Sequence, residues 1–450
     1  TSGLNVRNNV DYLMGVCVDI PGLAAYIPFR HKERNVDKQW LSPLVSILKE
    51  KPLIWHNRKF DFHSFATIGV DPLEFKGPQY CTLLIASLIN EELYSKELDA
   101  LAKLYLGKTK YEKEQVHKLA QAVGYANVPP ELYKDYGSQD ATLTRALRDK
   151  LWPELVSQEL EAVYWETESP FNDLLFQLER RGVGTFPSFC EEKVERGNGR
   201  MATIHRDLRG VNPASPKDLG QFLINELGLP VVAHTKSCEQ CTKYKRPVGS
   251  HSGPVSFNKA AMEEYDEMLE GQHNPSARMI LEYRGWQKAV SSLYLPMLEK
   301  VGPDGFIRTE FKQHGTVTGR LSAANPNLQQ IPRGSIKVWN GDAKSAFVSG
   351  RPEYKLIGWD YSQIELRLAA AYGQEAVLLT EFESPEADPF RVLAPIIFGE
   401  FTPETRQDTK TFVYANLYGA GLDKIAATLG RSRDSVEPLY RNYQNGIPGI

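Results

Sequence analysis

The sequence has no long hydrophobic run, no internal repeat and no regular cysteine pattern. None of its apolar stretches approaches the roughly 20 residues that cross a membrane. Residues 1–20 also lack the basic start and small-residue cleavage site of a signal peptide. The five cysteines are an odd number without regular spacing, which favours reduced thiols over a disulfide framework. We therefore expect a cytoplasmic protein with no membrane partner.

An excess of charge of one sign is also missing. The net charge of −3 over 450 residues neither indicates nor excludes a nucleic-acid partner, because phosphate binding depends on local charge. The segment from Arg308 to Lys355 is different, since it holds eight Lys and Arg against three acidic residues, a net charge of +5. It is either a binding segment or a solvated basic loop, and charge alone leaves both readings open.

The length favours two or more domains, because 450 residues exceed what one hydrophobic core usually serves. Residues 1–150 alternate short apolar runs with helical stretches. Residues 188–300 are expected to be mostly helical around a polar loop near 233–256, and loops, one short strand and further helices follow. The individual elements predicted are strands at Leu13–Val18 and Leu53–Trp55, helices at Trp40–Lys49 and Thr82–Ile89, and a long helical bridge from Leu151 to Arg181 closed by Gly182.

The strongest motif is the stretch from Leu356 to Arg367, LIGWDYSQIELR. Its apolar start predicts a strand that ends at Asp360, directly before a helix. A carboxylate carried there by a rigid element suits a Mg²⁺ ligand in a cleft. The alternative is that Asp360 only caps the helix that follows.

A second motif is a helix predicted to begin at Thr402-Pro403 and to stop at Gly419. Arg406, Lys410, Tyr414 and Tyr418 follow one another at intervals of four, so they lie along one gently winding stripe of that helix. Two cations followed by two aromatic rings suit a triphosphate with a sugar and base beyond it. The alternative is an amphipathic helix with exposed cations and two core tyrosines.

A third motif is a polar loop, TVTGRLS from Thr316 to Ser322, followed by NPNLQQIP from Asn325 to Pro332. It gathers hydroxyl and amide groups around Arg320. Such groups bond phosphates, sugars and the minor-groove acceptors that all base pairs present, which suits a protein that holds duplexes of any sequence. The alternative is a polar surface loop.

The front of the chain carries a further pair of motifs. Asn57-Arg58-Lys59-Phe60-Asp61 follows the predicted strand Leu53–Trp55, and Tyr136-Gly137-Ser138-Gln139-Asp140 is predicted to open a helix. A Tyr and an Asp four residues apart share one helix face, so both can address the same metal-bound water. Taken singly, each Asp could equally be a cap or a surface residue.

In order and spacing these motifs resemble the DNA polymerase I family (family A), with the front pair similar to two motifs of a 3′→5′ proofreading exonuclease. The resemblance extends over the whole chain and includes Glu282-Tyr283-Arg284 and Lys288. It implies an α+β fold, in which a ribonuclease-H-like exonuclease domain precedes a right-hand polymerase. The domains expected are an exonuclease-like domain at 1–150, a connector at 151–187, the thumb at 188–300, the first part of the palm at 301–372 and part of the fingers at 373–450.

The resemblance also implies roles for single residues. Two Mg²⁺ ions per active site would be held by Asp360 and the Tyr361 carbonyl in the polymerase. In the exonuclease, Asp61 and Asp140 would be metal ligands, and Tyr136 would orient the attacking water. The residues implied to bind the incoming nucleotide are Arg406, Lys410, Tyr414, Tyr418, Gln363 and Glu365, with Lys410 also catalytic and Glu365 excluding a 2′-hydroxyl. The residues implied to bind primer and template are Lys288, Arg320, Asn327, Gln329 and Gln330.

The sequence departs from the family pattern at both ends. The Asp-x-Glu strand that opens such nucleases has no counterpart, and the chain starts at Thr1 as if cut just after it. The second palm carboxylate, expected in a His-Asp-Glu turn beyond Tyr418, is also missing before Ile450. We therefore expect a fragment with little or no exonuclease activity and at most weak polymerase activity.

The implied partners are primer–template DNA, dNTPs and a processivity factor or helicase, with a monomeric protein. The order of domains, together with Tyr414, looks most like bacteriophage or other viral members, which would place the protein in a bacterial host cytoplasm. Three alternatives are a non-catalytic DNA-binding scaffold, a single-subunit RNA polymerase and a nuclease with an unrelated second half. A zinc site at His234, Cys238, Cys241 and His251 is a weak prediction, because one Cys-x2-Cys pair with scattered histidines is not a regular ligand set.

Overall fold

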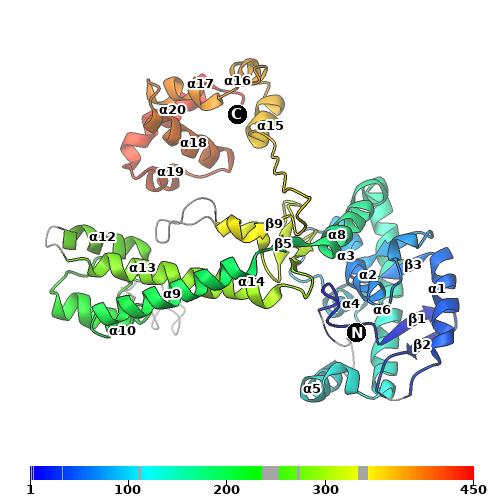
Figure 1. Cartoon of the computed structure of the whole chain (residues 1–450). Helices are drawn as coiled ribbons and strands as arrows, with labels where there is room; N and C mark the ends of the chain where they lie inside the picture. Colours follow the sequence, from blue (N-terminus) through cyan, green and yellow to red (C-terminus); the bar gives the residue numbers. More distant parts are fainter. Residues whose placement is uncertain are drawn as a thin grey trace. The chain divides into compact units, whose positions relative to one another are not determined.

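The computed structural model describes residues 1, 3, 5–32, 34–109, 113–235, 253–270, 274–332 and 343–450, without the side chains of 113–115 and 117. By contacts between residues the chain divides into two compact units, Thr1–Leu356 and Ile357–Ile450. Both units are drawn in Figure 1. Among the described residues no helix is both long and apolar enough to cross a membrane.

The front of the first unit mixes short strands with helices. Strand β1 pairs with β2 in an antiparallel hairpin, from Gly15 opposite Pro28 to Ile20 opposite Leu23, while β3 and β4 run parallel. The long helix α6 packs against β1, β2 and β3 and against α3 and α4 (Figure 1). The elements are β1 Gly15–Ile20, β2 Leu23–Pro28, η1 Lys38–Trp40, α1 Leu41–Glu50, β3 Leu53–Trp55, α2 Arg58–Ala66, η2 Pro72–Glu74, β4 Gln79–Cys81, α3 Thr82–Ile89, α4 Leu98–Leu106, α5 Lys113–Val123, η3 Tyr125–Asn127 and α6 Pro130–Ser157.

A helical connector follows, made of α7 Glu161–Val163, a π-helical turn η4 Tyr164–Glu168 and α8 Ser169–Arg181. The fully buried hydroxyl of Tyr164 fixes it to β4, since it accepts from the Cys81 N–H at 2.7 Å and donates to the Gln79 carbonyl at 2.8 Å. Gly182 ends α8 at a φ of 69°, which favours glycine. The predicted bridge is therefore helical and closed by Gly182, with a break at residues 158–160.

Two long helices, α9 and α13, lie side by side in the next part of the unit (Figure 1). A core of buried side chains that includes Met262, Tyr265 and Ile280 packs α12 and α13 onto the end of α9. This confirms the helical character predicted for 188–300. The elements are β5 Val183–Thr185, α9 Pro187–Asp207, α10 Pro216–Leu219, η5 Gly220–Glu226, α12 Lys259–Glu270, α13 Ser276–Ala289, η6 Val290–Tyr294 and α14 Leu295–Lys300.

Short strands complete the first unit. β5 lies between β6 and β9, antiparallel to both, and β7 pairs with β8 in a separate hairpin with Phe311 opposite Ala323. Sequence analysis predicted one short strand after residue 300, whereas the described residues form several. The elements are β6 Phe306–Ile307, β7 Glu310–Lys312, β8 Ser322–Ala324, η7 Leu328–Gln330, η8 Ala343–Ala346 and β9 Phe347–Val348.

The second unit is helical. Leu366, Phe390, Phe412 and Tyr443 from four of its helices are each at most 3% exposed and form one core. The elements are α15 Ile364–Tyr372, α16 Ala376–Phe382, α17 Pro389–Phe398, α18 Pro403–Leu417, α19 Leu422–Leu429 and α20 Arg433–Gly446.

The predictions of local structure in the front domain, residues 1–150, are largely confirmed. The strand Leu53–Trp55 and the helix Thr82–Ile89 have the expected bounds, and the first predicted strand is displaced by two residues, to Gly15–Ile20. The motif from Tyr136 to Asp140 does not open a helix, because α6 already begins at Pro130, where a proline suits the first turn.

The strand predicted before Asp360 is wrong. Residues 352–361 include no regular element, and Ile357 and Trp359 are 85% and 81% exposed. A strand needs a neighbour for its backbone N–H and C=O groups, and none of the described strands pairs with this segment. Asp360 is consequently on an irregular segment rather than at the end of a rigid strand.

Candidate functional site

The front domain brings two of the predicted metal ligands together. Asp61 lies in the first turn of α2, directly after β3, and Asp140 lies in the middle of α6. The pKa of the Asp61 carboxyl is raised to about 7, chiefly by burial and also by the nearby negative charge of Asp140. Two carboxylates that lie close enough for the charge of one to raise the pKa of the other form a site that a divalent cation would stabilise.

Tyr136 is one helical turn before Asp140 on α6 and packs beside the buried Tyr133 and Met14. It is partly exposed and therefore not a pure core residue. Across the described ranges of the chain, no group of three or more His, Cys, Asp or Glu side chains is arranged to hold a metal ion. The carboxylate pair alone thus fits one cation, and the fit is incomplete for a closed metal centre.

In the second unit, helix α18 has the predicted start and end. The Thr402 hydroxyl accepts from the Thr405 N–H at 3.1 Å while the Thr405 hydroxyl accepts from the Thr402 N–H at 2.7 Å, so the two ends of a capping box are present. The helix ends at Leu417, and Gly419 has a φ of 70°.

The predicted stripe of α18 lies to one side of its buried face, and Tyr414 within the stripe packs against the helical core. Thr405, Thr409, Phe412 and Val413 are buried, whereas Arg406 and Tyr414 are partly exposed and Lys410 is exposed. Tyr418, the residue after the helix, is 61% exposed. The alternative of two core tyrosines therefore fails for Tyr418.

Arg406 makes a paired contact that the sequence does not indicate. Its Nε donates to Asp388 Oδ2 at 2.7 Å and its Nη2 to Asp388 Oδ1 at 3.2 Å, a bidentate pair that leaves Nη1 outside it. Asp388 directly precedes α17, and the Phe390 ring lies under the guanidinium at 5.7 Å. The hydrogen bonds to Asp388 raise the pKa of Arg406, so its orientation is set while its charge is retained.

Glu365 and Tyr414 come close together from different helices. Burial raises the pKa of the Tyr414 hydroxyl, and the charge of Glu365 in the first turn of α15 raises it further, as does Tyr418. Gln363 is the residue before α15, with a left-handed φ of 53°, and its Oε1 is buried without a hydrogen-bond partner among the described residues. Nucleotide-binding residues predicted from two separate motifs are thus neighbours in the fold.

Asp360 lies on an exposed segment outside any helix or strand. Its side chain is exposed, as is Tyr361 at 66%. The residue that precedes α15 as its N-cap is Gln363, so the alternative that Asp360 caps this helix is wrong. A single exposed carboxylate has the oxygen chemistry for Mg²⁺ but does not by itself form a site.

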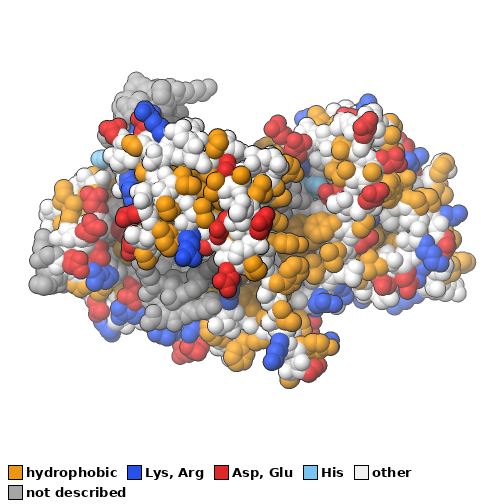
Figure 2. Space-filling view, turned by 90° about the horizontal axis from the view of Figure 1, so that it is seen from above, with side chains coloured by type: hydrophobic (Ala, Val, Ile, Leu, Met, Phe, Trp, Pro, Cys, Tyr) orange, Lys and Arg blue, Asp and Glu red, His pale blue; other side chains and the backbone are white. Residues whose placement is uncertain are grey.

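The predicted DNA-binding residues of the first unit are on its surface. Arg320 lies in the loop between β7 and β8, and Gln329 and Gln330 are exposed in η7, where Asn327 Oδ1 accepts from the Gln329 N–H at 3.1 Å. Lys288 is exposed in the last turn of α13. On the face drawn in Figure 2, Lys and Arg side chains alternate with Asp and Glu, in keeping with a net charge near zero.

Glu282 and Arg284, from the stretch Glu282-Tyr283-Arg284 in α13, make contacts within the fold. Glu282 accepts from Arg200 Nε at 2.6 Å and from Nη2 at 2.8 Å, which ties α13 to α9. Arg284 donates from Nε to the Pro213 carbonyl at 2.9 Å and from Nη1 to that of Phe257. Glu282 therefore joins the two long helices, and Arg284 joins α13 to the backbone at Pro213 and Phe257.

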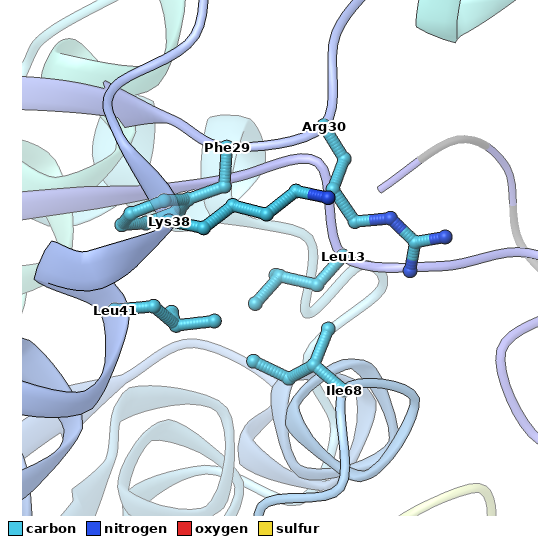
Figure 3. Close-up of a pocket in the computed structure, with 6 residues that line it drawn as sticks. All are labelled: Leu13, Phe29, Arg30, Lys38, Leu41 and Ile68. Atoms are coloured by element: carbon cyan, nitrogen blue, oxygen red, sulfur yellow. The ribbon is translucent and has the colours of Figure 1, made fainter.

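The zinc prediction lies mostly outside the described residues, since Cys238, Cys241 and His251 are not among them. His234 is described, and its Nδ1 is 2.8 Å from the Gly253 carbonyl oxygen. A small cavity of about 290 Å³ lies elsewhere, in the front domain (Figure 3). It is lined by Leu13, Phe29, Arg30, Lys38, Leu41 and Ile68, and none of these is a predicted site residue.

Two family models match the sequence. That of DNA polymerase family A matches residues 189–450, which is more than half of the chain. The chain belongs to DNA polymerase family A. A second model, described as 3′-5′ exonuclease, matches residues 1–156. The family predicted from the motifs is confirmed, and with it the α+β fold of an exonuclease domain followed by a polymerase domain. The single-subunit RNA polymerase and the nuclease with an unrelated second half are thereby set aside.

Bacterial proteins named DNA polymerase I are similar over nearly all of this family A chain. That of Pseudomonas aeruginosa is 28% identical over 450 residues, which cover 95% of the chain and 46% of the relative. That of Synechocystis sp. is 30% identical over 444 residues, covering 94% and 42%. The chain therefore spans about half the length of the curated relatives it matches. The viral placement stays a prediction.

A solved structure supports the fold. The POL domain of Pol1 from M. smegmatis, in complex with DNA primer-template and dNTP, matches with a TM-score of 0.74 and 23% identity. The match covers 97% of this chain and 70% of that one. At this level of identity it shows that the two proteins share a fold.

Sequence reasoning missed two acidic residues that matter to the arrangement. Asp388 holds Arg406, and its signal was an Asp-Pro pair at a helix start. Glu179 is 1% exposed in α8, on the same face as the buried Asn172 and Phe176. A carboxylate on the apolar face of an amphipathic helix is the pattern that would have drawn attention to it.

Proposed function

We propose that this protein carries out template-directed DNA synthesis, in which the primer 3′-hydroxyl attacks the α-phosphate of a dNTP and pyrophosphate leaves. The observation that carries the proposal lies within one compact unit of a family A chain. There, α18 presents Arg406, Lys410 and Tyr414 on one side, and Glu365 from α15 comes close to Tyr414. Two cations next to an aromatic ring and a carboxylate match the parts of a nucleoside triphosphate.

Each of these side chains has a distinct task in the proposal. Arg406, oriented by Asp388, and the exposed Lys410 bind the triphosphate. The ring of Tyr414 lies against the sugar and base, Tyr418 against the template, and Gln363 beside the nucleotide. Glu365 fills the space that a 2′-hydroxyl would need. Because α15 and α18, which carry or adjoin these groups, pack into one helical core, the geometry of the groups is set before the nucleotide binds.

Primer and template bind the first unit in this proposal. Arg320, Asn327, Gln329 and Gln330 lie in or just after the β7–β8 hairpin, where exposed donors can reach minor-groove acceptors and phosphates. Lys288 contributes a phosphate contact. The POL domain solved in complex with DNA primer-template and dNTP shares the fold, which supports this assignment of substrates.

Divalent metal ions belong to the proposal as Mg²⁺, two per active site. Asp360 and the Tyr361 carbonyl would contribute ligands to them for synthesis, and Asp61 with Asp140 would hold one of the two in the exonuclease domain. When bound, Mg²⁺ would activate the attacking oxygen and neutralise charge on the phosphate. Tyr136, one turn before Asp140, would orient the attacking water in the removal of 3′-terminal nucleotides.

Lys410→Ala tests the nucleotide site, with Lys424→Ala as the matched control in the exposed part of α19. A charge-assisted bond to phosphate is worth about 1.5–3 kcal/mol, so Lys410→Ala should weaken dNTP binding roughly ten- to hundredfold. The control removes the same charge from the same unit and should leave binding within about twofold. Binding is measured with a fluorescent dNTP, and primer extension is followed in parallel. Equal effects of the two variants would remove Lys410 from the site.

A further inference from the structure

The β7–β8 hairpin, which carries Arg320 in its loop, has unusually little structure of its own. Each strand has three residues, and in the part of the chain that the structure describes the pair forms a separate two-stranded sheet. An isolated two-stranded hairpin is marginally stable in water at best. The position of its loop must therefore be set by contacts from other parts of the unit.

At the middle of β7, the support is a buried charged cluster. Glu179 Oε1 accepts from the Phe311 N–H at 2.6 Å and from Lys59 Nζ at 2.5 Å, and Lys59 also donates to the Phe311 carbonyl. Glu179 Oε2 lies 2.7 Å from Nε2 of the fully buried His63. The N–H group of Phe311 is thus bound by α8 of the connector, and its carbonyl group by helix α2.

The turn side of the hairpin has its own contacts. Lys96, in the segment before α4, donates from Nζ to the His314 carbonyl at 2.8 Å. Gln313 donates to Glu168 Oε2 at 2.5 Å and accepts from Asn172 Nδ2 at 2.9 Å. Lys96 and the connector therefore hold the two residues that follow β7, where the chain enters the loop.

A third contact lies at the open end of the hairpin, away from its turn. Arg7 donates from Nη2 to Glu310 Oε2 at 3.1 Å, and the same oxygen accepts from Asn325 Nδ2 at 3.1 Å, next to the end of β8. Arg7, Lys59 and Lys96 come from three separate segments of the front domain. Three charged side chains that bind one hairpin at its open end, at the middle of β7 and near its turn fix its position and its tilt.

We infer that the front domain has a second role besides nuclease chemistry, which is to position the primer–template loop between β7 and β8. Arg7, Lys59 and Lys96 are positioning residues that act on DNA through the hairpin and Arg320. Charged groups that lose their solvation to bind a backbone carbonyl or a buried carboxylate contribute little net stability, but they select one geometry. The inference rests on the proposed function, since it takes the loop to be a DNA contact.

Lys96→Met is the most informative variant, because it removes one contact to the hairpin from a partly exposed side chain and leaves the buried cluster unchanged. Lys103→Met is the matched control, an exposed lysine of α4 in the same domain. Binding of the chain to a fluorescein-labelled primer–template duplex is measured by anisotropy. Because Lys96→Met loses one charge-assisted bond, it should bind the duplex about three- to tenfold more weakly than the wild type. Its midpoint of thermal unfolding should be unchanged. Lys103→Met should bind as the wild type does, and Lys96→Arg should restore most of the affinity.

A double-mutant cycle with Arg320→Ala separates positioning from direct contact. If Lys96 acts through the loop, Lys96→Met should have almost no further effect on affinity once Arg320 has been removed. Multiplicative effects of the two substitutions would mean that Lys96 touches DNA itself, which overturns the inference. Wild-type affinity for Lys96→Met, or a loss equal to that of Lys103→Met, would also overturn it. A wild-type chain that binds no primer–template would instead contradict the proposed function.

Discussion

Replacing Asp61 by asparagine should stabilise the fold at neutral pH in the absence of metal. The folded protein raises the pKa of Asp61 from 3.8 to about 7, chiefly through burial. Since the folded state holds this proton more tightly than the unfolded state, stability is lost as the pH rises from about 4 to about 7. Asparagine has no charge to bury, so its advantage should be absent near pH 4 and complete near pH 8.

The size of the effect follows from the pKa difference. A shift of about three units corresponds to about 4 kcal/mol, which is an upper limit because the side chain is partly accessible to water and Asn is not identical to a protonated Asp. We expect a gain of about 2 kcal/mol at pH 8, or roughly 4–8 °C in the midpoint of thermal unfolding of a domain of this size.

The assay is thermal unfolding between pH 4 and pH 8 with a chelator present, with Asp135→Asn as the control. Asp135 is exposed on the same helix as Asp140, so its replacement changes the net charge equally without relieving a buried carboxylate. The reasoning would be refuted if Asp61→Asn were no more stable than the control at pH 8. It would also be refuted if the gain in the unfolding midpoint were the same at pH 4 as at pH 8. Adding Mn²⁺ or Mg²⁺ should raise the midpoint of the wild type and leave that of Asp61→Asn almost unchanged.

Three further predictions concern other side chains. Asp388→Asn should weaken dNTP binding about three- to thirtyfold by releasing the bidentate hold on Arg406, measured as an increase in the dissociation constant, and unchanged binding would remove Asp388 from the site. Glu365→Ala should admit ribonucleotides in primer extension, and an unchanged ratio of ribonucleotide to deoxyribonucleotide incorporation would contradict its assigned role. His63 has its pKa lowered from 6.5 to about 4, chiefly by burial, so it contributes stability that is present above pH 6.5 and lost as the pH falls toward 4. His63→Gln should flatten this acid-side loss of stability in urea unfolding, whereas His205→Gln, at an exposed position, should not.

Local structure could be predicted from the sequence where its cause is local. The strand Leu53–Trp55, the helix Thr82–Ile89 and the capped helix α18 have the expected bounds, because side-chain periodicity, caps and glycine stops act over a few residues. The family could be predicted for the same reason, since its motifs are short runs whose order and spacing are visible in the chain. The prediction failed at Leu356–Trp359, where apolar composition is not sufficient for a strand without a pairing neighbour.

The sequence by itself therefore determined the family, several elements of the front domain and the stripe of Arg406, Lys410 and Tyr414 on one helix. Only the tertiary structure decided which groups meet those side chains. Asp388 reaches Arg406 from another helix, and Glu179 binds Lys59, His63 and Phe311 across more than a hundred residues of chain. The reason is physical: helix periodicity and caps are set by neighbours in sequence, whereas the partner of a buried charge is set by which elements pack together when the chain folds.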